Sequence, residues 1–303
     1  MSFTSIVKNE LSKLELDKVE AITELSAILK NSAVIESNKI KIITENSSVA
    51  RHIFNLIKDI YNINSKITVR KGYNYKKNYI YILEINGSID LIKEDLSLDS
   101  DIPKDYIVGD DILTRIYLRG VFIASGSVND PKKSRYHLEF MVDTLKYAEF
   151  IKEKLNLYDL NSKVIKRDNK FMIYIKEAEK IGDFLRMINA IQALLYFEDI
   201  RIYRDHKNMT NRLNNCEQAN VDKIIETATN QVKDIELIES IGGMDLLDDK
   251  TKIAATYRMK YKEVSLLELS EIISVETGVP ITKSGLHHRF TKIKNLANKI
   301  REK

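Results

Sequence analysis

The sequence lacks a second cysteine and any long apolar run. Cys216 is its only cysteine, which excludes an internal disulfide and a cysteine-based zinc cluster and fits a reducing compartment. The longest apolar runs are far shorter than the roughly 20 residues that a membrane-spanning helix needs, so we expect no membrane segment. Residues 1–16 mix charged and apolar side chains as an amphipathic helix does, and not as a signal peptide does. We therefore expect a cytoplasmic protein.

Negative charge is missing from one segment and concentrated in another. Residues 277–301 contain no Asp or Glu, although the formal net charge of the whole chain is only +4. Residues 90–111 are the opposite, because their acids far outnumber Lys93 and Lys104. With a proline and a glycine, this acidic stretch is typical of a solvated connector between packed units. The cations of the acid-free segment are Lys283, Arg289, Lys292, Lys294, Lys299 and Arg301.

The two sides of the acidic stretch show an internal duplication. Each side has a predicted helix, at 19–30 and at 112–124, followed by an alternating strand and an amphipathic helix. The echo is clearest at Asn64-Ser65-Lys66-Ile67 and Asn161-Ser162-Lys163-Val164, each of which opens a further strand. The unit is therefore helix, two strands, helix, two strands and a closing helix, which predicts an α+β fold with mainly antiparallel pairing.

The helix that opens each unit carries a recognisable motif. Residues 118–126 (LRGVFIASG) resemble the LAGLIDADG motif of homing endonucleases, and residues 25–33 (LSAILKNSA) are a weaker copy in register. Gly120 and Ala124 lie one turn apart, so with Ala27 they would let the two helices approach closely at a pseudo-twofold axis. An ordinary buried helix with two small residues would explain one copy. Two copies before matching strands favour a duplicated LAGLIDADG-like domain.

The motif helices do not end as those of a nuclease do. Cleavage by this fold needs an acidic residue near the end of each motif helix to hold divalent metal ions. Ser32 and Ser125 occupy those positions, and a neutral hydroxyl is a poor magnesium ligand. We therefore expect no catalytic residues, no metal site, no cofactor and no enzymatic activity. Lysines and arginines on the predicted strands leave two interpretations open, a solvated sheet face or a surface that binds the DNA backbone.

A helical hairpin is predicted in the acid-free segment. Its first helix has an apolar stripe from 266 to 273, the turn 277–280 ends it, and Thr282 is a good N-cap for the second helix. In the second helix, short polar side chains face away from the apolar stripe and cations flank them, as a recognition helix requires. The expected DNA-binding residues are Lys283, Ser284, His287, His288, Arg289, Thr291, Lys292 and Asn295.

Two alternatives to DNA binding are weaker. A basic helical hairpin could pack on another protein instead. A metal site at His287 and His288 is disfavoured, because adjacent helical residues point about 100 degrees apart and do not chelate one ion. The Asn-rich run 211–220 shows no recognisable catalytic arrangement, and Asn220 is a plausible N-cap for the amphipathic helix that follows it.

Four segments together resemble the WhiA family, which is found in Gram-positive bacteria. They are residues 2–11, 118–128, 208–220 and 283–289, and they occur in the family's order over nearly the whole chain. Residues 16–17 depart from the pattern, because many members have a cysteine pair near that position. The resemblance implies a nucleoid-associated transcriptional regulator of sporulation genes that influences cell division and chromosome segregation.

The resulting prediction is a duplicated LAGLIDADG-like α+β domain followed by an all-α helix-turn-helix domain. Its expected partner is double-stranded DNA, with further protein partners in transcription or division and no membrane. The rival functions are a protein-interaction scaffold with incidental DNA binding and an active endonuclease. The predicted boundaries are 1–95 for the first repeat with its N-terminal helix, 96–111 for the acidic connector, 112–207 for the second repeat, 208–250 for a connecting segment and helix, and 251–303 for the helix-turn-helix domain.

Overall fold

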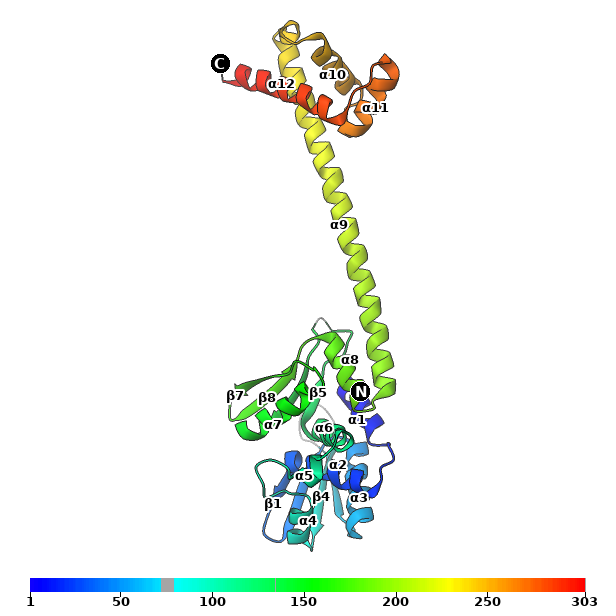
Figure 1. The fold of residues 1–303 in the computed structure, drawn as a ribbon, viewed down its shortest axis with the longest axis vertical. Coiled ribbons are helices and arrows are strands. Elements are labelled where there is room, and N and C mark those ends of the chain that lie inside the picture. Colours follow the sequence, from blue (N-terminus) through cyan, green and yellow to red (C-terminus); the bar gives the residue numbers. More distant parts are fainter. Residues whose placement is uncertain (72–78, 134, 303) are drawn as a thin grey trace. The chain divides into compact units, whose positions relative to one another are not determined.

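The computed structural model describes residues 1–71, 79–133 and 135–302, and it divides the chain into two compact units, 1–204 and 205–303 (Figure 1). The N-terminal unit mixes helices with two sheets, and the C-terminal unit is helical. The predicted α+β repeat followed by an all-α domain is therefore confirmed. Among the helices of the described residues, none is both long and apolar enough to cross a lipid bilayer.

The N-terminal unit contains two repeats with the same order of elements. The first consists of α2 (Lys18–Ser32), β1 (Ala33–Ile35), β2 (Lys39–Thr44), α3 (Ser47–Tyr61), β3 (Lys66–Lys71), β4 (Tyr79–Asn86) and α4 (Ile89–Asp95). The second consists of α6 (Asp111–Ser125), β5 (Gly126–Val128), β6 (Leu138–Val142), α7 (Leu145–Asn156), β7 (Lys163–Arg167), β8 (Lys170–Ile175) and α8 (Ala178–Met187). Both sheets are antiparallel, with the equivalent strand orders β1-β2-β4-β3 and β5-β6-β8-β7.

The two motif helices, α2 and α6, pack against each other in the centre of this unit. A Cβ atom added at Gly120 would lie 2.7 Å from the Cβ of Ala27 and 2.7 Å from the carbonyl oxygen of Glu24. The backbones are therefore too close for any side chain at position 120. Ala124, one turn further along α6, is partly buried against the same core.

Side-chain caps fix where the repeat helices begin. Asp17 and Glu20 form a capping box at the start of α2, and the Asp110 side chain accepts a hydrogen bond from the Leu113 amide at the start of α6. Asn46 and Thr144 cap α3 and α7 in the same way. The equivalent helices of the two repeats therefore begin with the same kind of cap.

The acidic stretch is not a solvated connector throughout, and this part of the prediction is wrong. Leu96 and Ile107 are fully buried, and Val108 is nearly so. The Ser26 hydroxyl donates to the Leu96 carbonyl at 2.6 Å, and the Thr23 hydroxyl donates to the Ile107 carbonyl at 3.2 Å. The sequence interpretation gave weight to the acids, which lie outward, whereas the apolar residues between them, including those of α5 (Asp105–Val108), pack into the core.

The predicted connecting segment, 208–250, is not a separate loop and helix. Helix α9 (Ile191–Ser240) runs through it without a break, so Asn220 lies inside a helix and is not an N-cap. No glycine or proline occurs between residues 191 and 240, and nothing else in the Asn-rich run stops the helix. Helix α1 (Phe3–Leu11) caps the start of α9. The Glu10 carboxylate of α1 accepts hydrogen bonds from the backbone amides of Gln192 and Ala193.

The C-terminal unit has its own core. Its elements after α9 are a short 3-10 helix (Gly243–Leu246), α10 (Asp249–Lys260), α11 (Leu266–Thr277) and α12 (Lys283–Arg301). Ile235 and Ile238 of α9 and Leu247 pack into this core with the apolar faces of the later helices. The core of this unit therefore includes residues before 251. The apolar faces of α11 and α12 alone are too small to form a core.

Candidate nucleic-acid interface

Helix α12 presents the side chains that the sequence assigned to DNA. Thr282 caps its first turn by accepting a hydrogen bond from the Gly285 amide at 3.1 Å, as predicted, and Gly278 adopts the left-handed conformation that ends α11. Leu286, Phe290, Ile293 and Ala297 are buried on one face. The face turned away from that core is exposed and continuous, because three-residue and four-residue steps keep it in line.

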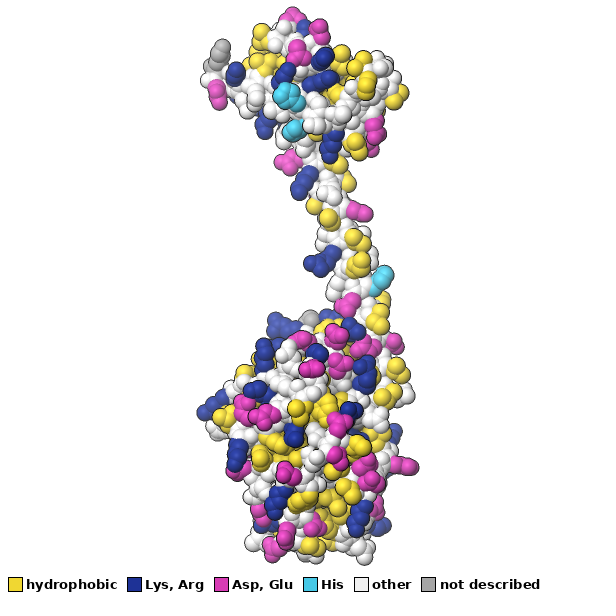
Figure 2. Space-filling view, in the orientation of Figure 1, with side chains coloured by type: hydrophobic (Ala, Val, Ile, Leu, Met, Phe, Trp, Pro, Cys, Tyr) yellow, Lys and Arg dark blue, Asp and Glu magenta, His cyan; other side chains and the backbone are white. Residues whose placement is uncertain are grey.

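The structure brings the predicted contact residues together on this surface. Ser284, His288 and Asn295 are exposed, and so are Lys283 and His287 at one flank. The Thr291 hydroxyl donates to the His287 carbonyl at 3.0 Å, whereas Arg289 at the other flank is partly buried. In Figure 2 the two adjacent histidine side chains at the top of the view lie among Lys and Arg side chains.

Lys292 is less available than the sequence suggests. Its ammonium group lies 3.0 Å from the carboxylate of Asp248, the N-cap of α10. The hydrogen bonds from Lys292 and Thr251 lower the pKa of Asp248 to about 2. Lys292 thus bridges α12 to α10, and a phosphate would have to compete with that carboxylate. The spacing Asp248 to Thr251 is an N-cap signature, so the sequence did contain a signal for this acid.

Arg301 is held in a second ion pair. It lies 2.6 Å from Asp234 of α9, within the C-terminal unit. Of the six cations in the acid-free segment, four remain without an ion pair to any described residue. They are Lys283, Arg289, Lys294 and Lys299.

Arg258 of α10 is an important residue that the sequence did not reveal. Its side chain is about 1% exposed, and its guanidinium group donates to the carbonyls of Tyr261 and Val264 at 3.1 and 2.8 Å. It also donates to the Gln231 side chain of α9 at 3.0 Å and stacks over the Phe290 ring. Burial lowers the pKa of this guanidinium group. Arg258 therefore joins α9, α10 and the turn before α11 beneath α12.

The two motif helices end without a metal-binding arrangement. The hydroxyls of Ser32 and Ser125 each donate back to a carbonyl of their own helix, at 2.7 Å to Ile28 and at 3.2 Å to Val121. Both serines thus complete the last turn of a helix. Across the described residues, no three His, Cys, Asp or Glu side chains come together as a metal site would require.

The acids near the motifs have other partners. Glu24 is buried beside His52 and Arg119. Glu36 pairs with Lys39 at 3.3 Å, and Asp143 pairs with Lys170 at 2.9 Å. Asp130 accepts a hydrogen bond from the Lys132 amide in a turn. Each of these carboxylates therefore has its own partner within the protein, and they do not converge on one position where a metal ion could bind.

A cation lies at the end of the first motif helix instead. Lys30 donates to the carbonyl of Ser100 and stands 5.5 Å from the centre of the Tyr147 ring. Burial lowers its pKa, while nearby Asp101 and Asp99 act in the opposite direction. A lysine at this position weakens the attraction that the nearby Asp99 and Asp101 would have for a divalent cation.

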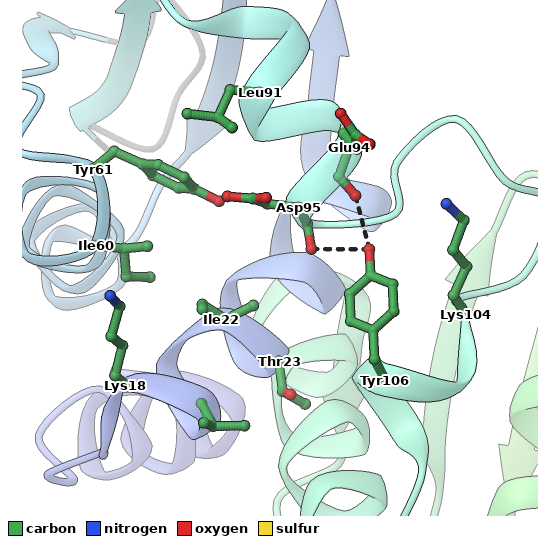
Figure 3. A pocket seen from close by; sticks show the side chains of 11 residues that line it. Lys18, Ile22, Thr23, Ile60, Tyr61, Leu91, Glu94, Asp95, Lys104 and Tyr106 are labelled. Atoms are coloured by element: carbon green, nitrogen blue, oxygen red, sulfur yellow. Dashed lines mark hydrogen bonds between the residues drawn. The ribbon is translucent and has the colours of Figure 1, made fainter.

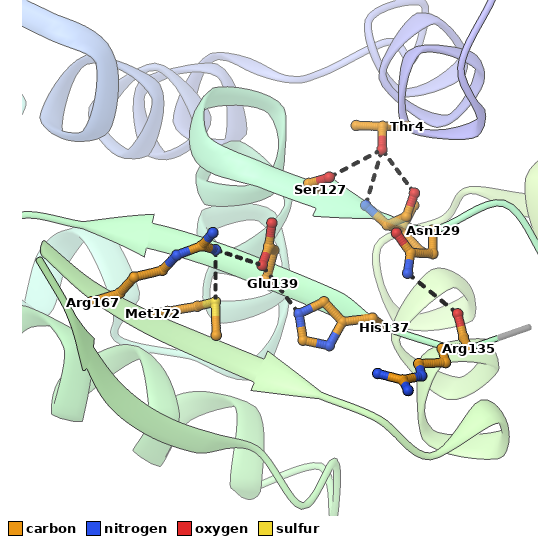
Figure 4. Close-up of polar contacts among 9 residues, drawn as sticks. Thr4, Ser127, Asn129, Arg135, His137, Glu139, Arg167 and Met172 are labelled. Atoms are coloured by element: carbon orange, nitrogen blue, oxygen red, sulfur yellow. Dashed lines mark hydrogen bonds and ion pairs between the residues drawn. The ribbon is translucent and has the colours of Figure 1, made fainter. Parts of the chain in front are cut away.

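The exposed face of the second sheet is only partly basic. Glu139 in its middle lies 3.1 Å from His137 and 3.9 Å from Arg167, which reduces the positive charge there (Figure 4). Beside this cluster lie Met141 and Ile165, the latter 42% exposed. An apolar centre of this kind gives little attraction for a phosphate backbone. The sheet-face lysines therefore carry less support as a DNA surface than α12 does.

A cavity of about 670 Å³ opens beside the first motif helix, between α2, α3, α4 and the segment that leads into α6 (Figure 3). The Tyr106 hydroxyl at its wall donates to the carbonyls of Glu94 and Asp95. Lys18 and Lys104 bring positive charge to the same lining. Its charges are of both signs, and its lining residues include no cysteine, serine or histidine that could act as a nucleophile with its base.

The fold and the α12 surface define a helix-turn-helix protein that carries a duplicated LAGLIDADG-like domain. Family models agree: a WhiA N-terminal LAGLIDADG-like domain matches residues 18–99, a WhiA LAGLIDADG-like domain matches 114–207, and a WhiA C-terminal HTH domain matches 210–297. The "Probable cell division protein WhiA" of Staphylococcus epidermidis is 44% identical over 99% of this chain and 98% of its own length. The chain belongs to the WhiA family.

Solved structures agree with this assignment. The full-length DUF199/WhiA structure from Thermatoga maritima is similar with a TM-score of 0.61 and 25% identity, covering 99% of both chains. A structure of the N-terminal LAGLIDADG domain of DUF199/WhiA covers 62% of this chain and 90% of its own, with a TM-score of 0.53 and 26% identity.

Proposed function

We propose that this protein is a DNA-binding transcriptional regulator that acts in cell division and sporulation and does not cleave DNA. The acid-free exposed face of α12 is the observation that carries the proposal. Its N-cap, its buried opposite face and its position after α11 support its use as the recognition helix. The name of the Staphylococcus epidermidis relative supports the link to division.

In the proposed binding mode, the N-terminal half of α12 enters the major groove. Ser284, His287 and His288 would meet base edges, because their short polar groups and ring nitrogens form hydrogen bonds there. Lys283 and Arg289 would lie nearest to phosphates or to a guanine. A chromosomal site of this kind would make the protein nucleoid-associated.

The proposal of a non-cleaving domain rests on the motif ends. Ser32 and Ser125 bond to their own helices, and Lys30 occupies the end of the first motif helix. Incubating the protein with supercoiled plasmid and magnesium should leave the plasmid unnicked. Nicking that is lost in a variant at either motif end would overturn this part of the proposal.

The decisive experiment measures DNA affinity of the full chain against genomic fragments while salt is varied. With three or four phosphate contacts, the log-log slope of affinity against salt should be about −3. Arg289→Ala should weaken binding to the best fragment by about 1–3 kcal/mol if Arg289 reads a guanine. Lys207→Ala, an exposed cation of α9, is the matched control and should leave affinity unchanged. Equal affinity of wild type and Arg289→Ala would remove Arg289 from the interface.

A protein-interaction scaffold is the second candidate function, and exposed apolar side chains on the first sheet favour it. Val34 is 58% and Ile43 is 51% exposed on the face opposite the helices. Exposed apolar patches of this kind often mark protein interfaces. The scaffold would predict weak binding that does not depend on DNA sequence, and it would tolerate substitutions on α12 that abolish specific DNA binding.

A further inference from the structure

Helix α9 contains a long stretch that no other helix of the C-terminal unit packs against. Every residue from 205 to 227, at the start of the C-terminal unit, is exposed. The side chains of residues 206–227 form no ion pair. The Gln218 amide donates a hydrogen bond to the Asp222 carboxylate on this stretch, at 2.9 Å. Helices in water are marginal without tertiary packing or many side-chain pairs. The stretch therefore needs a partner to be stable as a helix.

One face of this stretch has the spacing of a coiled coil. Its side chains recur at alternating steps of three and four residues, so they form a narrow stripe along the helix. Met209 is 64% and Leu213 is 55% exposed, although both are apolar. Ile202 precedes the stripe at the same spacing. The stripe consists of His206, Met209, Leu213, Cys216 and Asn220.

We infer that this stripe pairs with the same stripe of a second copy of the chain, parallel and in register. In heptad terms, His206, Leu213 and Asn220 take the a positions, whereas Met209 and Cys216 take the d positions. A single Asn at an a position faces its counterpart on the neighbouring helix and fixes register and two-stranded pairing at some cost in stability. Asn220 is placed to do this.

The charges beside the stripe support the parallel orientation. Arg212 and Glu217 take the g and e positions, five residues apart, and both are exposed and form no ion pair with each other. A parallel in-register pair places Arg212 of one copy beside Glu217 of the partner subunit, which is favourable. An antiparallel pair would place g against g and e against e, so that like charges would meet.

The same chain is the fitting occupant because the face is complementary to itself. A parallel two-stranded pair sets every position against its own copy, which is the condition for an isologous interface. Asn220 then finds an amide partner and the apolar side chains at 209 and 213 leave water. Dimers with helix-turn-helix domains bind two half-sites, so pairing would supply two α12 helices to one DNA.

The single cysteine reports this pairing directly. Oxidation of the full-length protein by diamide should join Cys216 to Cys216 of the partner subunit: two thiols form one S–S bond, and their two electrons and two protons reduce the diamide. A disulfide needs Cα atoms about 4.4–6.8 Å apart, which opposed d positions of a parallel pair provide. We expect a rapid covalent dimer on non-reducing gels, and we expect equally rapid crosslinking in the double variant Cys216→Ser, Met209→Cys. The double variant Cys216→Ser, Asn215→Cys, on the opposite face, should stay uncrosslinked.

Sedimentation equilibrium measures the dimerisation constant directly, without a crosslinking reaction. Leu213→Glu should weaken dimerisation at least about tenfold, because each dimer loses two buried leucines, whereas Asn215→Glu should have no effect. Arg212→Glu should weaken the dimer, and adding Glu217→Arg should restore it if the helices are parallel. A monomeric wild type that crosslinks no faster than the Asn215→Cys variant would overturn the inference. Crosslinking at 216 but not at 209, with no rescue by the charge exchange, would overturn the parallel register.

Discussion

The two repeats of the N-terminal unit place different chemistry at equivalent positions. Glu24 immediately precedes the first motif and Tyr117 immediately precedes the second, while His52 and Phe150 each lie six residues after the N-cap of the following helix. In the first repeat the two helices meet through His52 and Glu24, 2.5 Å apart. In the second they meet through an edge-to-face contact of Tyr117 and Phe150, with ring centres 6.2 Å apart.

The comparison shows how one repeat depends on the other. A contact between two aromatic rings needs no compensating charge, but a buried carboxylate does. Arg119 of the second repeat supplies it by donating from its Nε to Glu24 across the pseudo-twofold axis. The buried carboxylate of the first repeat therefore depends on a cation of the second, whereas the Tyr117–Phe150 contact of the second involves no buried charge.

The largest expected effect comes from breaking this dependence. Arg119→Leu leaves Glu24 buried with His52 alone and should destabilise the N-terminal unit by about 3–5 kcal/mol in urea unfolding followed by circular dichroism. The triple variant Glu24→Leu, His52→Phe, Arg119→Leu makes the first repeat apolar like the second and should recover most of that loss. A single variant as stable as the wild type would show that Arg119 does not compensate Glu24.

The close approach of the motif helices predicts the next effect. Gly120→Ala puts a Cβ atom 2.7 Å from both the Ala27 Cβ and the Glu24 carbonyl oxygen, so the helices must move apart. We expect a loss of about 1–3 kcal/mol in the same unfolding experiment. Adding Ala27→Gly should recover part of the loss, because it removes one of the two clashes. Recovery to full stability would mean that the backbone contact at Glu24 costs nothing.

A hydrogen-bond chain across the repeats predicts a smaller effect. The Tyr147 hydroxyl lies 2.8 Å from that of Tyr117 and accepts a hydrogen bond from the Asn31 side chain at 2.9 Å. Tyr147→Phe should destabilise the protein by about 1–2 kcal/mol, because the buried Tyr117 hydroxyl and the partly buried Asn31 amide each lose a partner. Tyr174→Phe, on the exposed sheet face, should change the unfolding free energy little. Equal effects of both variants would argue against the cross-repeat chain.

Local pattern was enough to predict the architecture. The alternating strands, the N-cap at Thr282 and the repeat of the Asn-Ser-Lys segment are encoded within a few residues of each other, and the structure agrees with them. The continuity of α9 also had a local signal, the absence of glycine and proline, which the Asn-rich composition obscured. Burial within the acidic stretch depended on Leu96 and Ile107, whose apolar character was outweighed by the acids around them.

The buried polar contacts between distant parts of the chain could not be predicted from local sequence patterns. Glu24, His52 and Arg119 are far apart in sequence and meet only when the repeats pack, and none has a periodic signal of its own. Arg258 is similar, because a charged residue near a helix end normally predicts exposure. The α12 surface could be predicted as a set of residues, but the loss of Lys292 to Asp248 depends on how α10 packs beside it.

The smallest expected effect concerns the pH dependence of stability and a lysine that lies beside the second motif helix. Lys8 of α1 stands 5.8 Å from the centre of the Phe122 ring, whose counterpart in the first repeat is Leu29, and burial lowers the pKa of Lys8 to about 8. Below pH 8 the lysine is charged in both states, so its burial cost is fully present. Between pH 8 and 10 the unfolded chain binds more protons than the folded one, so stability should rise with pH.

Because the Lys8 side chain keeps some contact with water, this rise should be about 1 kcal/mol between pH 7 and 10. Lys8→Met should abolish the rise and should be the more stable protein at pH 7, since the apolar side chain has no charge to desolvate against Phe122. Lys13→Met, at an exposed position, should keep the wild-type pH dependence. If the unfolding free energies of the three proteins rise in parallel with pH, Lys8 stays charged in the folded protein and its burial beside Phe122 has no cost.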